Sequence, residues 1–439
     1  MLHDEAVPFL SKTNLENTAM NICIFEDEKY RKLLPLVYFR PVYELRCGIT
    51  LLKDKIIRSF SSPTVILHAR DYLTDLLKRD YPNFYVNEIP SGVDQVLFIN
   101  GRVLAEPHLA DKFKYNGKDI AFVKDGEVVA FWATGENLQK FKSKFGKPFS
   151  NSDLDGFEKI ETNVKLITYP WELVNNNGEQ ILIDFNILTE GKAKKLGKVY
   201  DGAHLLNEHF IHIEEGAKIK PGVVLDAENG PIYIGKNVKI LPNAVIEGPA
   251  YIGDDSLIKV SAKIYENTSI GPVCKVGGEV EASIIHAYSN KQHEGFIGHS
   301  YLGTWVNIGA DTNNSDLKND YGNVKVYIDG ELVDSGSMFV GLTMGDHSKS
   351  GINTMFNTGT VVGVSCNIYG AGLPPKFVPS FSWGGAEDGF VTYRIDKAIE
   401  VAKRVMARRK IQFTEIDEKL FRKVFELTQE ERDKNGVKD

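Results

Sequence analysis

Aliphatic residues recur at every sixth position through the middle of the chain. The series is Ile213, Ile219 and Leu225, and after a three-residue insertion Ile234, Ile240, Ile246, Ile252, Ile258, Ile264, Ile270 and Val276. A small or slender side chain follows four positions after all of them except Leu225: Ala217, Val223, Val238, Ala244, Ala250, Ser256, Ala262, Thr268, Cys274 and Val280. An α-helix repeats every 3.6 residues, so a helix cannot produce this pattern.

A period of six with a bulky and a small inward position predicts a left-handed parallel β-helix. Each hexapeptide forms one side of a triangular prism, and about 18 residues form one coil. Residues that tolerate tight turns follow the aliphatic positions, as corners require: Gly235, Asn237, Gly253, Asp254, Asp255 and Gly271. The alternative is a β-sandwich with regular turns, which the unbroken register from Ile234 to Val276 disfavours.

Two excursions interrupt the repeat. The register breaks between Val276 and Leu302, and a second segment, residues 313–337, interrupts it again. After that segment we expect the inward column to return at Val340, Asp346, Ile352, Thr358 and Val364. Long interruptions of a solenoid often carry binding function, because the coils already supply rigidity.

The rest of the chain predicts an α/β domain before the repeats and a helix after them. Strand-like runs such as 22–25, 64–68 and 96–99 alternate with helical spacing. We therefore expect a flexible N-terminal tail at 1–19, an α/β domain at 20–185, a connecting segment at 186–210, the β-helix at 211–372 and a C-terminal extension at 373–439. That extension contains an amphipathic helix at 393–409 with Ile395, Ile399, Ala402 and Met406 on one face.

Composition excludes several classes of partner. The 439 residues carry a net charge of −7, so no global positive field is available to hold nucleic acid or an anionic membrane. No run approaches the 18 apolar residues of a membrane span, and no secretory signal is evident. The four cysteines lie far apart without a CxxC pair, which indicates reduced thiols and predicts a cytoplasmic protein.

Two sets of segments resemble one family, the bifunctional sugar-1-phosphate nucleotidylyltransferase/amino-sugar-1-phosphate acetyltransferases. In the repeat region they are GHSYLG at 298–303, VNIGADTN at 306–313 and SGIN at 350–353. In the first domain they are LPLVYFRP at 34–41 and VLFINGR at 96–102. The resemblance implies transfer of an acetyl group from acetyl-CoA to an amino-sugar phosphate, nucleotidyl transfer with Mg²⁺ in the first domain, sugar phosphate and nucleotide sugar as ligands, and a homotrimer.

Acetyl transfer to an amine needs a base, and histidine suits that role near neutral pH. The resemblance makes His299 the first candidate, although one residue, Ser300, separates it from Tyr301 where the family has two. His293 is the second candidate, with Lys291 beside it as a partner for a phosphate. The alternative for either histidine is a structural role in a loop or core.

The resemblance also implies substrate-binding residues. Tyr301 and Asn313 match residues that hold the sugar phosphate and the acceptor amine, and Asn314 lies beside them. Without the resemblance, Tyr301 is a wall residue and 313–316 a turn cluster. A zinc site built from His293, His299 and His347 is a weaker alternative, because it requires three converging histidines.

The first domain departs from the family where the phosphates and the metal would bind. The place of its glycine-rich loop is FEDEKYRK at 25–32, which has no glycine, and the metal-binding Asp after the strand at 96–99 is replaced within Asn100-Gly101-Arg102. Either cations such as Arg31, Lys32, Arg40 and Arg46 substitute, with Asn100 contacting the substrate, or the domain binds a nucleotide sugar without making it. A third alternative is that these arginines are ordinary surface charges. Asp27 and Asp184 are weak candidate metal ligands.

Basic residues at the end of the C-terminal helix are candidates for a CoA phosphate. They are Arg404, Arg408 and Arg409, and favourable charges at a helix C-terminus explain them equally well. Two functions remain open from the sequence. One is the acetyltransferase with nucleotidyl transfer, and the other is a non-catalytic nucleotide-sugar-binding or scaffold protein.

Overall fold

The computed structural model describes residues 20–439, so the tail predicted at 1–19 lies outside the described part. The described chain divides into two compact units. One comprises residues 20–28, 52–166 and 403–420, and the other comprises residues 29–51, 167–402 and 421–439.

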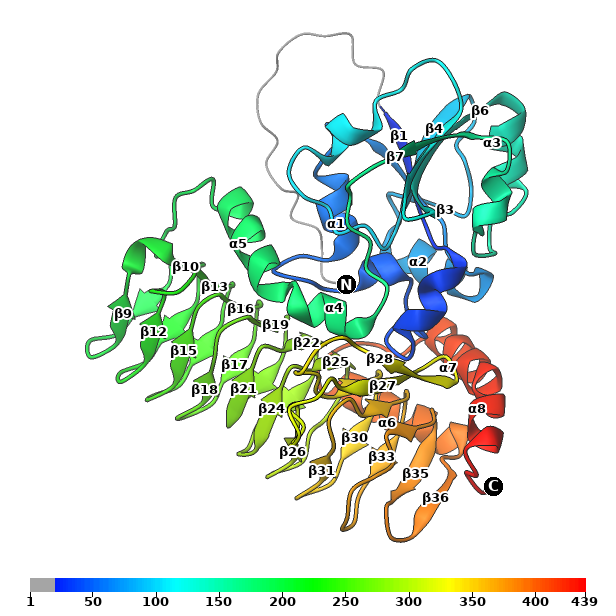
Figure 1. Ribbon diagram of the computed structural model, residues 1–439. Coiled ribbons are helices and arrows are strands. Elements are labelled where there is room, and N and C mark those ends of the chain that lie inside the picture. Colours follow the sequence, from blue (N-terminus) through cyan, green and yellow to red (C-terminus); the bar gives the residue numbers. More distant parts are fainter. Residues whose placement is uncertain (1–19) are drawn as a thin grey trace. The chain divides into compact units, whose positions relative to one another are not determined.

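The first unit is a mixed sheet with short helices, as the sequence predicts. Its seven strands lie in the order β3-β2-β1-β4-β6-β5-β7 (Figure 1). Their bounds are β1 Asn21–Phe25, β2 Thr64–Leu67, β3 Tyr85–Val86, β4 Gln95–Asn100, β5 Ile120–Lys124, β6 Glu127–Thr134 and β7 Glu158–Glu161, and the helices are α1 Leu52–Ile57, α2 Thr74–Asp80 and α3 Gly135–Lys142. Strand β1 pairs in parallel with β2 and β4. Buried phenylalanines fill one side of the sheet, with Phe98 and Phe131 stacked at 4.6 Å.

The second unit contains the predicted left-handed β-helix, whose short strands stack into three faces (Figure 1). The first face is β10 Ile211–Ile213, β13 Ile232–Ile234, β16 Ala250–Ile252, β19 Thr268–Ile270, β22 Ile284–Ala287, β25 Tyr301–Thr304, β29 Thr343–Met344, β32 Val361–Val362 and β34 Phe377–Val378. The second is β8 Lys198–Val199, β11 Lys218–Ile219, β14 Lys239–Ile240, β17 Leu257–Ile258, β20 Lys275–Val276, β23 Asn290–Lys291, β30 Lys349–Ser350, β33 Asn367–Ile368 and β35 Ser382–Gly385, with β36 Gly389–Thr392 antiparallel at its end. The third is β9 His204–Leu206, β12 Val224–Asp226, β15 Val245–Glu247, β18 Lys263–Ile264, β21 Glu279–Glu281, β24 Phe296–Gly298, β26 Asn313–Asn314 and β31 Met355–Phe356.

The inward columns are those that the period predicts. Ile234, Ile252 and Ile270 pair in register on one face, one coil of 18 residues apart, and none of the three is exposed. Both the aliphatic and the small columns belong to one continuous core. The corners use left-handed backbone, with φ of 56° at Asn237 and 57° at Asp255, a conformation that Asn and Asp tolerate better than other side chains.

The register predicted after the second excursion is wrong by two residues. Leu302 pairs with Met344, and Met344 pairs with Val362, so the inner column runs through Met344 and Val362. Ile352, which was expected inside, is 69% exposed. In a strand, residues two apart face the same way, and the apolar pattern therefore does not separate these two registers.

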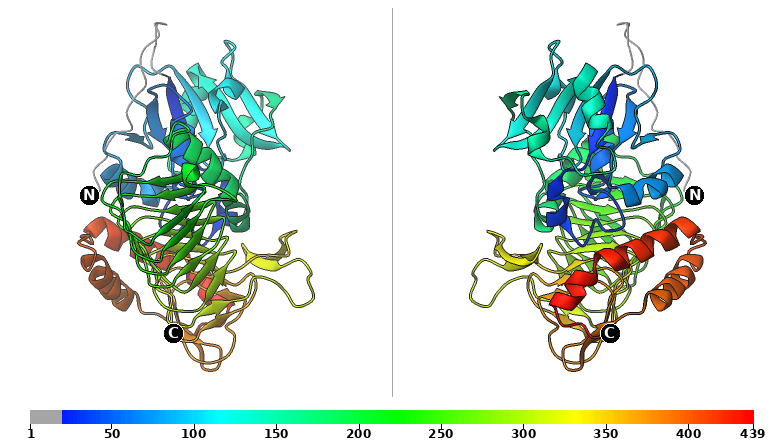
Figure 2. Two further views of the ribbon diagram at one scale, coloured as in Figure 1. Left: turned by 90° about the vertical axis from the view of Figure 1, so that its left-hand side faces the viewer. Right: turned by 90° about the vertical axis from the view of Figure 1, so that its right-hand side faces the viewer.

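The second excursion carries a hairpin, β27 Lys325–Ile328 and β28 Glu331–Asp334. Figure 2 shows the hairpin standing out from the flank of the prism. Its base is anchored, because Val324 and Val326 are buried in a cluster with Trp171 and Val340. The excursion is therefore an ordered element.

Residues 29–51 pack on the first face of the prism together with α4 Pro170–Asn175 and α5 Asn177–Leu188. The Gly48 N–H donates to Asn177 Oδ1 at 2.7 Å, and the Ser269 hydroxyl donates to Gly48 O at 2.9 Å. Asp184 accepts from the Ile49 N–H at 2.8 Å. A segment that precedes most of the first unit in sequence is therefore part of the second.

Three helices follow the last coil: α6 Ile395–Ala407, α7 Glu415–Leu427 and α8 Gln429–Lys434. Helix α6 is the predicted amphipathic helix, and Ile399, Ala402 and Met406 are buried on its apolar face. Helices α7 and α8 were not predicted from the sequence. None of the helices between residues 20 and 439 combines the length and the apolar composition that crossing a bilayer requires.

Candidate functional sites

His299 lies at a corner of the prism, directly after β24. Its backbone is left-handed, with φ of 44°. The His299 N–H donates to Glu281 O at 3.1 Å, and its carbonyl accepts from the Gly341 N–H at 2.9 Å. These bonds to the neighbouring coils fix the position of the imidazole. The ring stacks on Phe339 at 4.9 Å and its side chain is 19% exposed, so a ligand can reach it.

Asp316 pairs with this histidine. Its Oδ2 lies 2.8 Å from His299 Nδ1, and because a carboxylate only accepts, Nδ1 carries the hydrogen and Nε2 is left as the basic nitrogen. Gly298 makes room for the pair, because a Cβ at this position would lie 2.4 Å from Asp316 Oδ2. A histidine oriented by a carboxylate is the arrangement of a general base. Asp316 was expected only as part of a turn cluster, and its contact with His299 was not predicted.

Glu281 adds negative charge beside the pair. Burial raises the pKa of its carboxyl, and Asp316 adds to that rise while His299 opposes it. Glu281 is therefore a second acidic group beside His299 at this corner of the prism.

His293 lies at another corner of the prism, two residues after Lys291, the last residue of β23. His293 is exposed and borders two cavities of about 450 and about 310 Å³. The other residues that line these cavities are Lys259, Val260, Gly278, Gln292, Glu294, Asn307, Ile308, Gly309, Ala310, Asp311, Ser350, Gly351 and Ile352. Lys291 is 1% exposed and takes the inward position that Val276 has in the preceding coil. Its Nζ donates to Gly277 O at 3.0 Å and to His293 O at 2.8 Å.

Burial lowers the pKa of Lys291 to about 8. The pKa of a lysine in the unfolded chain is near 10.5. Between pH 8 and pH 10.5 the unfolded chain therefore keeps a proton on Lys291 that the folded chain has lost. The contribution of Lys291 to stability consequently rises with pH. We therefore expect wild type to gain stability over Lys291→Met as pH rises from 8 to 10.5, measured by urea unfolding. Lys239→Met, at an exposed position, should follow wild type. A constant difference between wild type and Lys291→Met would contradict the expectation.

Tyr301 is 1% exposed and faces residues 29–51. Its hydroxyl accepts from the Arg46 N–H at 2.9 Å, donates to Arg46 O at 3.2 Å and lies 3.2 Å from His286 Nδ1. Asn313 bonds the Phe296 N–H at 2.8 Å, and Asn314, 3% exposed, bonds both Gly298 backbone groups at 3.0 Å. All three side chains named as substrate-binding candidates are thus engaged in bonds between neighbouring segments of the fold.

Replacing Tyr301 by phenylalanine tests its role. The change leaves buried polar groups of Arg46 without a partner, and we expect a loss of about 1–3 kcal/mol in unfolding free energy. Chemical denaturation checks the loss. A stable Tyr301→Phe protein with a raised KM for a sugar phosphate would instead identify a substrate contact.

The cations expected to hold a nucleotide belong to the second unit. Arg31 is exposed at the end of the 3₁₀ helix Glu28–Leu33, and Lys32 Nζ lies 3.3 Å from the Tyr169 hydroxyl. Arg40 is buried and bonds Asp346 and Thr304. Asn100, by contrast, belongs to the first unit.

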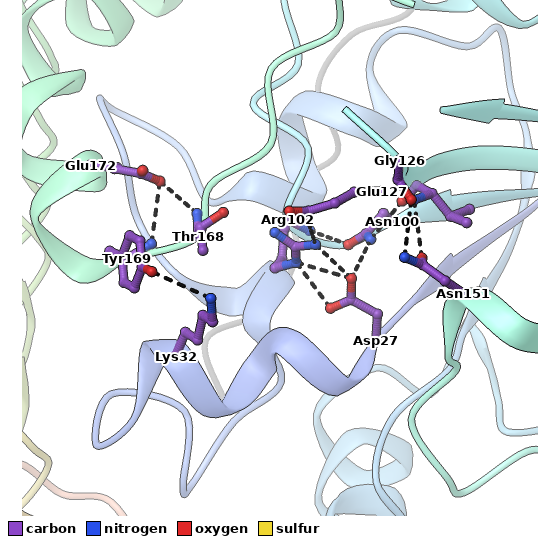
Figure 3. A network of polar contacts seen from close by, with 11 residues as sticks. Asp27, Lys32, Asn100, Arg102, Gly126, Glu127, Asn151, Thr168, Tyr169 and Glu172 are labelled. Atoms are coloured by element: carbon purple, nitrogen blue, oxygen red, sulfur yellow. Dashed lines mark hydrogen bonds and ion pairs between the residues drawn. The ribbon is translucent and has the colours of Figure 1, made fainter. Parts of the chain in front are cut away.

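Asn100 and Asp27 belong to a buried polar network of the first unit (Figure 3). Asn100 Nδ2 donates to Asp27 Oδ2 at 2.9 Å. Arg102, with no exposed surface, binds Asp27 and Glu127 through Nη2 at 2.6 and 2.7 Å. The carboxylates that could hold Mg²⁺ here are bound to a guanidinium, so the residues as arranged do not fit a divalent ion.

The other metal hypotheses also lack a donor set. Asp184 is bonded by the N–H groups of Ile49 and Thr50 and by the Thr50 hydroxyl. Within residues 20–439 no group of three or more His, Cys, Asp or Glu side chains is arranged to hold a metal ion. The zinc hypothesis therefore has no support in the described part of the chain.

The basic residues predicted to meet a CoA phosphate lie at the end of α6. Arg404 is in its last turn, and Arg408 and Arg409 follow it. Arg404 and Arg408 are exposed, and Arg409 is partly buried. Their role toward CoA stays a prediction.

Comparison with known proteins matches both parts of the chain. Residues 22–193 match the family model described as sugar nucleotidyl transferase, and residues 231–265 match the model described as bacterial transferase hexapeptide. The UDP-N-acetylglucosamine acyltransferase of Francisella novicida, a solved structure, aligns with 14% identity over 51% of this chain and 89% of that chain, with a TM-score of 0.28. That score is too low to support an inference about function.

Two curated relatives are named as bifunctional proteins. The bifunctional protein GlmU of Methanocaldococcus jannaschii is 29% identical over 62% of this chain and 70% of its own length. The bifunctional sugar-1-phosphate nucleotidylyltransferase/acetyltransferase of Sulfurisphaera tokodaii is 30% identical over 53% of this chain and 61% of its own length. The matching segments therefore leave a third or so of each relative uncovered. With the α/β sheet and the hexapeptide prism, these matches show that residues 22–193 are similar to sugar nucleotidyl transferases and that residues 231–265 are similar to hexapeptide-repeat transferases.

Proposed function

We propose that the second unit transfers an acetyl group from acetyl-CoA to the amino group of a sugar phosphate such as glucosamine 1-phosphate. The observation that carries the proposal is the His299–Asp316 pair, with Nδ1 and Oδ2 2.8 Å apart at a partly exposed corner of the prism. The names of the bifunctional relatives supply the reaction class.

In this mechanism His299 acts as the base and Asp316 positions it. The amine attacks the thioester carbonyl carbon, and Nε2 accepts the proton that the nitrogen loses. Asp316 holds the Nδ1–H and stabilises the imidazolium. When the C–S bond breaks, the imidazolium returns the proton to the CoA sulfur, so the products are an N-acetyl sugar phosphate and free CoA thiol.

A homotrimer is part of the proposal. Exposed apolar side chains border the cavities beside His293, with Val260 53% and Ile352 69% exposed, and a second copy of the chain would cover them. Light scattering at micromolar concentration should give about three times the chain mass of 49.1 kDa. A mass of one chain would overturn the trimer.

The activity is tested by thiol release. Purified protein with acetyl-CoA and glucosamine 1-phosphate should release free thiol, with galactosamine 1-phosphate and glucosamine 6-phosphate as parallel acceptors. Reactions without acceptor measure background hydrolysis. No release above background with any amino-sugar phosphate would overturn the proposal and favour a binding or scaffold role.

A further inference from the structure

Asp27 and Arg102 lie where an open α/β sheet binds its ligand. Asp27 follows β1 by two residues, and Arg102 follows β4 by two residues. These strands are parallel neighbours, and the chain continues from β1 to β2 on one side while β4 lies on the other. The carboxyl ends of strands at such a switch point form the usual ligand crevice.

One guanidinium occupies this position and binds both nearby carboxylates. Arg102 Nε lies 2.9 Å from Asp27 Oδ1, and Nη2 lies 2.6 Å from Asp27 Oδ2 and 2.7 Å from Glu127 Oε2 (Figure 3). A single nitrogen atom thus stands between two carboxylate oxygens, as a shared cation would. The carboxylates retain some access to solvent, with 15% of the Asp27 and 23% of the Glu127 side chain exposed.

The Asn100 side chain bonds both Asp27 and the backbone of Arg102. Asn100 Oδ1 accepts from the Arg102 N–H at 3.0 Å, and Asn100 Nδ2 donates to Asp27 and to Val128 O, both at 2.9 Å. Burial alone would lower the pKa of Arg102, but Asp27 and Glu127 raise it further than burial lowers it. The charge is therefore permanent, and an ion could enter only by leaving a buried arginine without its partners.

A second ion pair of the same kind serves as an internal comparison. Glu26, next to Asp27, points to the β2 side, where Arg70 Nε binds its Oε2 at 3.0 Å and Arg70 Nη2 binds its Oε1 at 3.1 Å. Glu26 has no exposed surface. Arg70 thus binds the fully buried carboxylate of Glu26, whereas Arg102 bridges the partly exposed carboxylates of Asp27 and Glu127.

We propose that Arg102 is a resident cation that takes the place of a divalent ion between Asp27 and Glu127. The first unit therefore has no divalent-cation site at this crevice, and metal-dependent nucleotidyl transfer, which relies on such an ion to offset phosphate charge, does not take place there. A ligand bound at this crevice would bind without a divalent ion. The inference rests on the first unit alone and is independent of the acetyl transfer proposed for the second.

The test measures Mn²⁺ binding to the full chain by the loss of the free-ion signal in electron paramagnetic resonance. Wild type should bind no Mn²⁺ at this crevice, so the Asp27→Asn variant should bind the same amount of Mn²⁺ as wild type. Arg102→Ala frees two carboxylates to face each other and should bind about one Mn²⁺ per chain. The double variant Arg102→Ala with Asp27→Asn should lose that ion.

Thermal unfolding gives a second readout and a matched control. Arg102→Ala should lower Tm by roughly 5–10 °C, and millimolar MgCl₂ should restore several degrees, because an ion that binds only the folded chain stabilises it. Arg70→Ala should lose comparable stability with no restoration by MgCl₂. If Arg102→Ala does not fold, Arg102→Gln serves in its place.

Two results would overturn the proposal. One is stoichiometric Mn²⁺ binding by wild type that Asp27→Asn removes. The other is a folded Arg102→Ala or Arg102→Gln protein that binds no Mn²⁺ and gains no more Tm from MgCl₂ than Arg70→Ala does. Thiol release from acetyl-CoA reports on the second unit in every variant, so loss of the acetyltransferase activity is recognised separately.

Discussion

Replacing His299 by glutamine should lower kcat for acetyl transfer by about 10²–10⁴-fold, the usual contribution of a general base. The side chain is at the prism surface, 19% exposed, so Tm should change little. Thiol release under saturating acetyl-CoA and sugar phosphate measures the effect. His293→Gln is the matched control, because that histidine is exposed on the cavity wall.

Asp316→Asn separates positioning from catalysis. The amide still bonds Nδ1 but carries no charge to stabilise the imidazolium, so we expect a smaller loss of kcat than in His299→Gln and a shift of the pH–rate profile. If His293→Gln abolishes activity while His299→Gln retains it, the base is His293 and the role given to Asp316 is wrong.

Replacing Asp346 by alanine should cost about 3–5 kcal/mol of unfolding free energy, because it leaves the buried Arg40 guanidinium without its carboxylate. The Asp346 side chain is 4% exposed and that of Arg40 is 10% exposed. Denaturant unfolding monitored by circular dichroism measures the loss.

The control for this prediction is an exposed pair of the same unit. Asp320→Ala removes a carboxylate that binds Lys318 at the surface, and no measurable loss is expected. The double variant Arg40→Met with Asp346→Leu should regain much of the lost stability, since a well-packed apolar pair can replace a buried ion pair. A loss for Asp346→Ala no larger than that for Asp320→Ala would show that the buried pair contributes nothing.

The prism was predictable because its signal is periodic and local. Each coil repeats the same inward positions, so Ile234 to Val276 alone determine the fold and its corners. The failure after residue 337 has the same origin. The hairpin excursion separates the coils, and residues two apart point to the same side of a strand, so Ile352 and Ser350 were equally acceptable inward positions.

The candidate sites were less predictable, because their residues meet through long-range contacts. Asp316 reaches His299 from the next coil, 17 positions along the chain, and needs the space that Gly298 leaves. Arg40 was expected beside a nucleotide, but a carboxylate 306 positions away binds it. Pairings of this kind leave no periodic trace in a single sequence, whereas the absence of glycine at 25–32 is visible in the sequence itself.

The packing of residues 29–51 on the prism has a consequence for how this gene could be divided or recombined. A fragment that begins at the first coil would lack the backbone that bonds Tyr301 and Ser269, and it would expose Asp346 without Arg40. Such a fragment would contain every coil of the prism, but the first face would no longer be covered by residues 29–51. A chimera of two relatives should therefore fold only when residues 29–51 and the repeats come from the same parent. The structural boundary between the two units is not the position in the sequence where the repeats begin.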